Sequence, residues 1–431
     1  MKLKRPIIYL ATLPVLFVIA AVVKFAMGKF EEPGDRAALQ EELRLARADG
    51  IPTTWQEFAS SIKAAEPGEN AANLYRQLHH EEKTSTGIVK LEADLLFQQT
   101  PEHSAAAKAL VEQRKQDLAL VDQAAKLPKC WFDRNWQNGL EPATPEHALM
   151  KEIAEIVALR GSIDGVDNRP EDAINNVREV FRIARHAEQE GTAESSAVSE
   201  DIFTVGIRHL AIWAYVFRDR AIYREALAGA IHAWPSIKMQ EMHRGDLVEV
   251  LRVADLSTSP EGRTALGLKV DQGQSSEWLI PLLSNRLRAK VKMVEAERKI
   301  WAAFGMQAGK RMPALKSASD ELSDALSAFP SGKIAYFWIG QNAVNSPNVD
   351  EDWESRRLCF GAILRALSVN PIAQAIKTID LRSPFDQKPI SYRFDGRQMK
   401  ITVSCPDLSI DLPPMLFPNR PELMAMRRGK P

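Results

Sequence analysis

A basic start followed by an apolar run is the clearest pattern in the sequence. Residues 1–5 carry two lysines and one arginine, and residues 6–23 are uncharged and mostly apolar. At about 1.5 Å per residue, a helix over this run is about 27 Å long, close to the thickness of a bilayer core. With Lys24 reaching the interface and residues 25–27 added, the pattern predicts a transmembrane helix over 6–27 and an anchoring segment over 1–29.

The charges on the two sides of this run predict its orientation. Three cations precede it, whereas Glu31, Glu32 and Asp35 follow it, so the positive-inside rule places the N-terminus in the cytoplasm. The alternative is a cleaved secretory signal, whose apolar core is usually about 7–15 residues long and ends in a small-x-small site. The core here is longer, and only Ala26-Met27-Gly28 offers such a site. We therefore expect an uncleaved, single-pass protein of a bacterial inner membrane with a periplasmic C-terminal domain.

Helical periodicity dominates residues 30–380. Thr100-Pro101-Glu102 and Thr144-Pro145-Glu146 each combine a hydroxyl cap, a proline at the first helical position and an early carboxylate, so long helices are predicted to begin near 101 and 145. Further helical runs cover 170–190, 197–217, 236–255, 278–304, 313–329 and 351–377. The stretch 258–277 is rich in Gly, Ser and Thr and is a candidate hinge. The sequence predicts a mainly α-helical ectodomain, for which a solenoid-like stack of helix pairs is an alternative.

The character of the chain changes after residue 380, where prolines become frequent. Two short runs of the strand type, 391–394 and 398–403, flank Asp395-Gly396, a pair that favours the turn of a β-hairpin. We predict a β-hairpin segment over 381–415 and a flexible tail over 416–431.

Composition and charge narrow the classes of function. Lys+Arg and Asp+Glu both number 56, and this zero net charge lacks the basic field expected of a nucleic-acid-binding protein. Three cysteines, Cys130, Cys359 and Cys405, allow at most one disulfide bond. Cys359 with Cys405 is the candidate pair, and three buried thiols are the alternative.

The strong catalytic and cofactor motifs are absent from the sequence, including the phosphate-binding loop, the dinucleotide glycine pattern and the zinc-protease helix. Weaker patterns are the ligand-type run 79–82, the i, i+4 pair His186 and Glu190, and the Ser-x-x-Lys spacing of Ser60 and Lys63. Each lacks the supporting partners that a metal ligand or nucleophile requires. Solvated polar helix faces explain the two histidine patterns, and chance explains the Ser-x-x-Lys spacing. We therefore expect no catalytic residue, no cofactor and no metal.

Three arginines at i, i+4 and i+7, Arg178, Arg182 and Arg185, are positioned to line a groove for an anionic group. The acidic residues Glu171, Asp172 and Glu179 are close enough in sequence to neutralise them. The pattern therefore favours an ordinary charged outer face of a helix.

The stretch 130–136 is densely aromatic and falls in a loop between two predicted helices. Exposed tryptophan together with arginine is typical of interface hot spots. Trp131, Arg134 and Trp136 are therefore candidate contacts for a protein partner, and the alternative is a loop whose rings pack onto the core.

Several segments together resemble a large family of bacterial membrane-anchored, mainly helical extracytoplasmic proteins that has no assigned activity. The matching segments are 50–54, 69–75, 130–132 with Asp133 and Trp136, 158–161, 170–173, 181–186 and 383–393. Ser383 and Gln387 replace the family's usual Asp and Gly in the last segment. The resemblance implies the architecture and transfers no catalytic residue.

These patterns together predict a membrane-anchored extracytoplasmic helical scaffold or protein-interaction module rather than an enzyme. Its expected partners are the membrane, through residues 6–27, and an unidentified protein. Two alternatives are an envelope hydrolase whose site is assembled from distant residues and a ligand-binding or sensory ectodomain.

Overall fold

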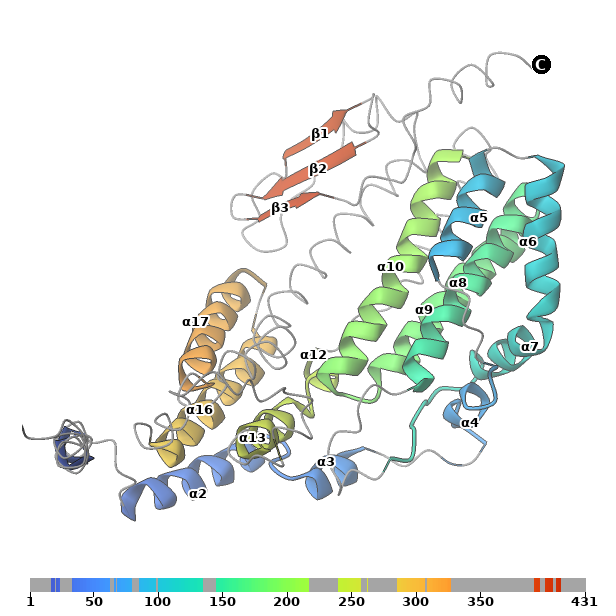
Figure 1. The fold of residues 1–431 in the computed structure, drawn as a ribbon. Coiled ribbons are helices and arrows are strands. Elements are labelled where there is room, and N and C mark those ends of the chain that lie inside the picture. The colour runs from blue at the N-terminus through green and yellow to red at the C-terminus, as the bar shows by residue number, and fades with distance from the viewer. Residues whose placement is uncertain are drawn as a thin grey trace, which may run out of the picture. The chain divides into compact units, whose positions relative to one another are not determined.

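The fold is mainly α-helical, as the sequence predicts (Figure 1). The computed structural model describes residues 17–19, 21–23, 33–62, 66, 68–79, 85–97, 100–134, 145–216, 239–256, 262, 285–306, 308–326, 391–395, 400–405 and 408–411. Contacts divide the chain into two compact units. One comprises residues 1–61, 245–305 and 313–347, and the other comprises 62–244, 306–312 and 348–431.

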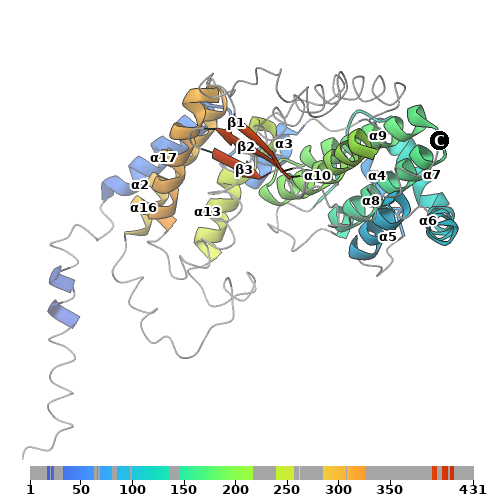
Figure 2. The same cartoon turned by 90° about the horizontal axis from the view of Figure 1, so that it is seen from above.

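Helix α8 (Pro145–Val166) lies at the centre of the larger unit. Fifteen of its 22 residues are buried, because it packs against α9 (Pro170–Glu188) and α10 (Ala193–Val216) and also against α5 (Ser85–Phe97) and α6 (Pro101–Gln113). Figures 1 and 2 show α8, α9 and α10 side by side. The short helices α4 (Ala72–Tyr75), α7 (Lys115–Ala124) and α12 (Met239–Met242) complete the described helices of this unit up to residue 244.

Tight turns make α8, α9 and α10 antiparallel neighbours. Asn168 adopts a positive φ of 62° between α8 and α9, and asparagine tolerates this conformation better than most residues. At the start of α10, the Ser195 backbone N–H donates to Thr192 Oγ1 at 3.2 Å and the Thr192 N–H donates to Ser195 Oγ at 3.0 Å. Gly206 of α10 faces the Phe181 ring of α9 so closely that an added Cβ would lie 2.5 Å from it. The two helices therefore approach closely.

The predicted helix starts at residues 101 and 145 are confirmed. Thr100 is the N-cap of α6 and accepts from the His103 backbone N–H at 3.4 Å. The helix beginning at 101 is not continuous, because the backbone of Arg114 departs from helical geometry and separates α6 from α7. The Arg114 side chain, 4% exposed, instead binds Asp117 of α7 at 2.7 Å and Glu152 of α8 at 2.5 Å.

The smaller unit contains α2 (Pro33–Ala48), α3 (Trp55–Ser61), α13 (Asp246–Leu256), α16 (Arg286–Phe304) and the part of α17 (Ala308–Leu326) that follows Met312. Helices α2 and α16 pack together through a core that includes Leu39 and Val294. Arg298 adds ion pairs to Glu42 at 2.8 Å and Asp49 at 2.7 Å. This packing joins segments about 250 residues apart, a pairing that periodicity alone does not predict.

Two of the predicted helical runs have different boundaries. The run 236–255 is divided by a turn at residues 243–245 into α12 and α13. The run predicted to begin at Pro313 is part of α17, which begins at Ala308 and holds Pro313 inside the helix. Sequence reasoning placed the proline at the first turn, where proline is best tolerated.

The C-terminal part contains three antiparallel strands in the order β1 (Ser391–Asp395), β2 (Lys400–Cys405) and β3 (Leu408–Asp411). Tyr392 pairs with Val403 and Phe394 with Ile401. Residues 396–399, where the hairpin turn is predicted, lie outside the described residues, so the hairpin stays a prediction. Sequence reasoning did not identify β3, a four-residue strand after Pro406.

Several other sequence predictions fall mostly or wholly outside the described residues. They concern the hinge 258–277, Cys359, the run 351–377 and the tail 416–431. Of the predicted transmembrane segment 6–27, only residues 17–19 and 21–23 are described, and these are helical. Within the part of the chain that the structure describes, no helix combines the length and the apolar character needed to cross a membrane.

Candidate binding cleft

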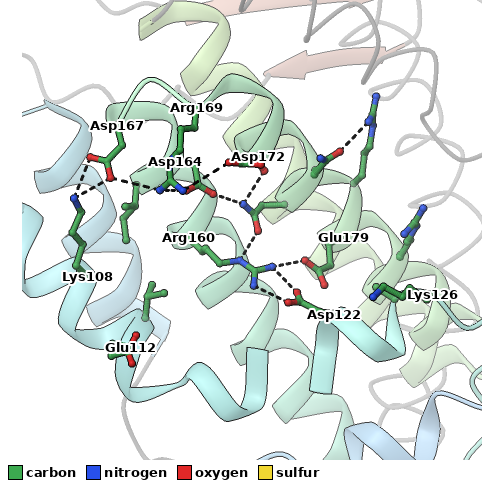
Figure 3. A pocket seen from close by; sticks show the side chains of 17 residues that line it. Lys108, Glu112, Asp122, Lys126, Arg160, Asp164, Asp167, Arg169, Asp172 and Glu179 are labelled. Atoms are coloured by element: carbon green, nitrogen blue, oxygen red, sulfur yellow. Dashed lines mark hydrogen bonds and ion pairs between the residues drawn. The ribbon is translucent and has the colours of Figure 1, made fainter. Parts of the chain in front are cut away.

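A polar cleft of about 770 Å³ opens in the larger unit, lined from α6, α7, α8 and α9 (Figure 3). Only three of the lining residues that the structure describes are apolar: Val111, Ala125 and Ile163. The charged and amide side chains around it are Lys108, Glu112, Asp122, Lys126, Arg160, Asp164, Asp167, Arg169, Asp172, Asn175, Asn176, Arg178, Glu179 and Arg182. The cleft is therefore suited to ionic and hydrogen-bonded ligands.

Arg160 of α8 is the centre of the polar network. Its guanidinium donates to Asp122 Oδ1 of α7 at 2.9 Å and to Glu179 Oε2 of α9 at 2.5 Å. Its Nε atom donates to Asn176 Oδ1 of α9 at 2.5 Å. Figure 3 shows the Arg160 guanidinium in contact with both carboxyl groups. One guanidinium thus connects three helices.

The two carboxyl groups bound by Arg160 titrate differently. Burial raises the pKa of Glu179 most strongly, Arg160 opposes this, and the adjacent Asp122 raises it further, to about 8. For Asp122, burial also acts to raise the pKa, but hydrogen bonds from Arg160 and Glu179 outweigh it and leave the pKa below its ordinary value. Near neutral pH, burial and the closeness of the two carboxyl groups favour one proton shared by the Glu179–Asp122 pair.

A second group of charges occupies the turn between α8 and α9. Asp164 binds Arg169 at 2.5 Å and accepts from Asn176 Nδ2 at 2.8 Å. Burial raises the pKa of Asp164 despite the opposing charge of Arg169. Asp167 binds Lys108 of α6 at 2.9 Å. The carboxylates at this end therefore already have cationic partners within the protein.

The aromatic loop packs at another place on the same unit. Asn70 holds Trp131 by both backbone groups, accepting from its N–H at 2.8 Å and donating to its carbonyl at 2.8 Å. Phe132 is 1% exposed, and the Arg134 guanidinium lies 5.1 Å from its ring centroid. Phe132 therefore packs onto the core, as the alternative interpretation of this loop predicts, whereas Trp131 is half-buried.

Arg134 lies in a network of ion pairs and its side chain is only 6% exposed. It binds Glu190, and it lies 3.4 Å from Glu146. His147 Nε2 lies 2.6 Å from Glu190 on the other side. Among the candidate partner contacts, Trp131 and Arg134 thus lie on one docked loop, Trp136 is outside the described residues, and a contact with a partner stays a prediction.

The predicted metal-spacing pair is engaged in other contacts. His186 Nε2 donates to the Leu127 carbonyl at 2.9 Å, so its Nδ1 accepts from the Tyr75 hydroxyl at 2.9 Å. Burial lowers the pKa of His186 to about 4. Glu190 binds Arg134 and His147 instead. Across the described ranges, no three His, Cys, Asp or Glu side chains are grouped to hold a metal ion.

The remaining sequence candidates are not brought together as a site. His79 is 70% exposed and its Nδ1 lies 2.9 Å from Asp117. Ser60 is exposed on α3, and His80 and Lys63 lie outside the described residues. Cys130 is a buried free thiol, and burial raises its pKa well above the ordinary value.

The fold and the cleft define a mainly helical protein with a charged binding cleft. Comparisons with protein-family models, with curated proteins and with solved structures find no match.

Proposed function

We propose that this protein is a membrane-anchored helical scaffold that holds a protein partner through the cleft between α6, α7, α8 and α9. The anchor is residues 6–27, and the helical body lies in the periplasm. The unit that contains the cleft supplies the binding surface.

The observation that carries this proposal is the chemistry of the cleft. Twelve charged and two amide side chains surround it, and its described lining includes no serine, threonine, cysteine, tyrosine or histidine. Such a lining supports recognition by charge and hydrogen bonding, whereas the usual nucleophiles and imidazole bases are missing from it.

The proposed anchor is supported by the basic start of the sequence and by exposed apolar side chains near the N-terminus. Helical residues near the N-terminus expose large apolar side chains, with Phe17 at 61%, Val18 at 59% and Val22 at 59%. A group of exposed apolar side chains is typical of a surface that contacts a membrane or another protein. The basic residues 1–5 support a cytoplasmic N-terminus. A C-terminal fusion to a reporter that works only in the periplasm should be active, and activity confined to a cytoplasmic reporter would reverse this topology.

Site-specific photocrosslinking in cells tests the binding role. Glu112 borders the cleft and its side chain is 72% exposed, so a photoreactive residue there should yield a discrete crosslinked adduct. Lys90 on α5 is the matched control, because it is exposed and does not line the cleft. Adduct formation at 112 but not at 90 is expected. The same adducts at both positions, or none at 112, would contradict the proposal.

One observation favours a second candidate, an envelope hydrolase. Glu179 and Asp122 share one proton near neutral pH, and a carboxylic acid paired with a carboxylate is the arrangement that general acid–base hydrolysis uses. Glu179→Gln tests it, because this change removes the exchangeable proton. Cleavage of purified envelope glycan by the natural protein, abolished in Glu179→Gln, would favour the hydrolase over the scaffold.

A further inference from the structure

Arg178 and Arg182 are not paired with Glu179 or Asp172, the carboxylates near them in sequence. Both line the cleft, whereas Arg185 lies outside it and binds Glu188 at 2.6 Å. Glu179 is bound by Arg160 instead, and Asp172 lies 3.8 Å from Arg169. Arg185 therefore has an ion-pair partner on its own helix, whereas Glu179 and Asp172 are bound by other arginines and do not pair with Arg178 or Arg182.

Lys126 joins these arginines at the same cleft. It follows the end of α7, near enough to Asp122 to lower the pKa of that carboxyl. Arg182 acts in the same way on Glu179, which is the hydrogen-bonded neighbour of Asp122. Figure 3 places Lys126 beside this carboxyl pair. Lys126 and Arg182 thus flank one centre, and Arg178 precedes Arg182 by one helical turn.

Among the described residues, these three cations have no counter-charge in contact with them. Within the described residues, no carboxylate lies at ion-pair distance from Lys126, Arg178 or Arg182. Arg178 donates to a neutral amide, Asn175 Oδ1, at 3.1 Å, and its buried Nε has no hydrogen-bond partner. An unpaired buried donor is costly, and an oxyanion ligand would satisfy it.

The protonation of Glu179 strengthens the positive character of this end. With one proton shared by Glu179 and Asp122 near pH 7, this pair carries a single negative charge beside four cations, Arg160 together with the three already described. At the other end, the carboxylates already have cationic partners in Arg169 and Lys108. The end of the cleft at Lys126, Arg178 and Arg182 therefore has an excess of positive charge, which attracts an anion.

We propose that the end of the cleft formed by Lys126, Arg178 and Arg182 binds a phosphate-type oxyanion group. A guanidinium group can bind two oxygens of a phosphate with paired hydrogen bonds, and three neighbouring cations suit the several oxygens of a phosphate group, whether it is a free phosphate or a phosphodiester. This inference goes beyond the proposed protein-binding role of the cleft, because it assigns one end of the cleft a second, small-molecule ligand. The group is supplied either as a free phosphate compound or as a phospholipid headgroup.

Calorimetric titration of the full chain in a neutral detergent tests this site. The probes are inorganic phosphate and glycerophosphoglycerol, the headgroup of phosphatidylglycerol without its tails. At about 0.15 M chloride, where weak surface attraction is screened, we expect saturable binding with a dissociation constant of about 1 mM or lower. Arg182→Gln should weaken binding at least about tenfold. Arg185→Gln is the matched control, since it removes the same charge about one turn away and outside the cleft. Its dissociation constant should stay within about twofold of that of the unchanged protein.

Binding of phosphate with this variant pattern supports the site and a free phosphate ligand. Binding of glycerophosphoglycerol alone, with the same pattern, supports the site and a lipid headgroup. No saturable binding of either probe, or equal losses in both variants, overturns the inference. If Arg182→Gln does not fold by circular dichroism, Lys126→Gln repeats the test at an exposed position. If the crosslink at 112 forms but no anion binds, only the oxyanion site is refuted. If the anion binds but the crosslink at 112 does not form, only the scaffold function is refuted.

Discussion

His147 Nε2 lies 2.6 Å from Glu190 Oε2, and both side chains are almost completely buried. Burial lowers the pKa of His147, but hydrogen bonds and charges from Glu190 and Glu194 outweigh it and raise the pKa to about 9. Glu190 also binds Arg134, so a charged imidazole helps to hold the aromatic loop on α8 and α9. The ion pair therefore ties the packing of this loop to pH.

The first prediction is an alkaline loss of stability through His147. Because the folded pKa is raised, the contribution is complete below about pH 6.5, the unfolded value, and is lost as pH rises through about 9. The free energy of unfolding should fall by about 3 kcal/mol across this window. Urea unfolding of His147→Gln should lack this part of the decline. His79→Gln, the exposed control, should retain it, and equal behaviour of the two variants would contradict the assignment.

The second prediction concerns Glu179. Its raised pKa destabilises the folded protein near neutral pH, because the carboxyl group is kept from ionising there, whereas the raised pKa of His147 stabilises it. The unfolded chain ionises near pH 4.5 while the folded protein keeps the proton up to about pH 8, so stability falls over this interval. Gln at 179 keeps one donor for Asp122 and one acceptor for Arg160 without a proton to lose. Glu179→Gln should therefore raise the free energy of unfolding at pH 7 by up to about 3 kcal/mol, because at this pH the folded protein still holds the proton and the unfolded chain has lost it. Destabilisation at pH 7 would show that Glu179 is ionised there.

The sequence predicts the local elements of this fold and not the long-range contacts of its cleft. The start of α6 was predictable because Thr100, Pro101 and Glu102 act within one turn. The break at Arg114 was not, because its partners Glu152 and the His79 carbonyl are separated from it by 38 and 35 residues. Tertiary ion pairs of this kind leave no periodic signal.

The cleft shows the same limit. Arg178 and Arg182 were visible as an i, i+4 pair, and sequence proximity suggested Glu179 as a neutralising partner. The structure instead joins Glu179 to Arg160 on another helix and to Asp122 on a third. Sequence distance therefore gave the wrong ion pairs, because the competing cation comes from α8.

The third prediction tests the buried Tyr75–His186 contact. Tyr75→Phe removes the donor to His186 Nδ1 and leaves that nitrogen unsatisfied in a site with no exposure at position 75. The free energy of unfolding should fall by about 1–3 kcal/mol, the usual cost of an unsatisfied buried group. Chemical denaturation measures it. Binding at the cleft should be unchanged in the folded variant, and lost binding with full stability would assign His186 a functional role instead.

The last prediction concerns Arg160, which binds the side chains of Asp122, Asn176 and Glu179. Arg160→Leu keeps much of the side-chain volume and removes every one of these donors, leaving a partly buried carboxylate without its cation. Breaking one member of a buried ionic network typically costs about 3–5 kcal/mol, and partial exposure of Arg160 places the expected loss nearer 3 kcal/mol. Arg44→Leu is the control, because both partners of its pair with Glu41 are exposed, and the change should leave the free energy of unfolding almost unaltered. Urea denaturation of the two variants measures the difference, and similar small losses would mean that Arg160 does not hold α7, α8 and α9 together.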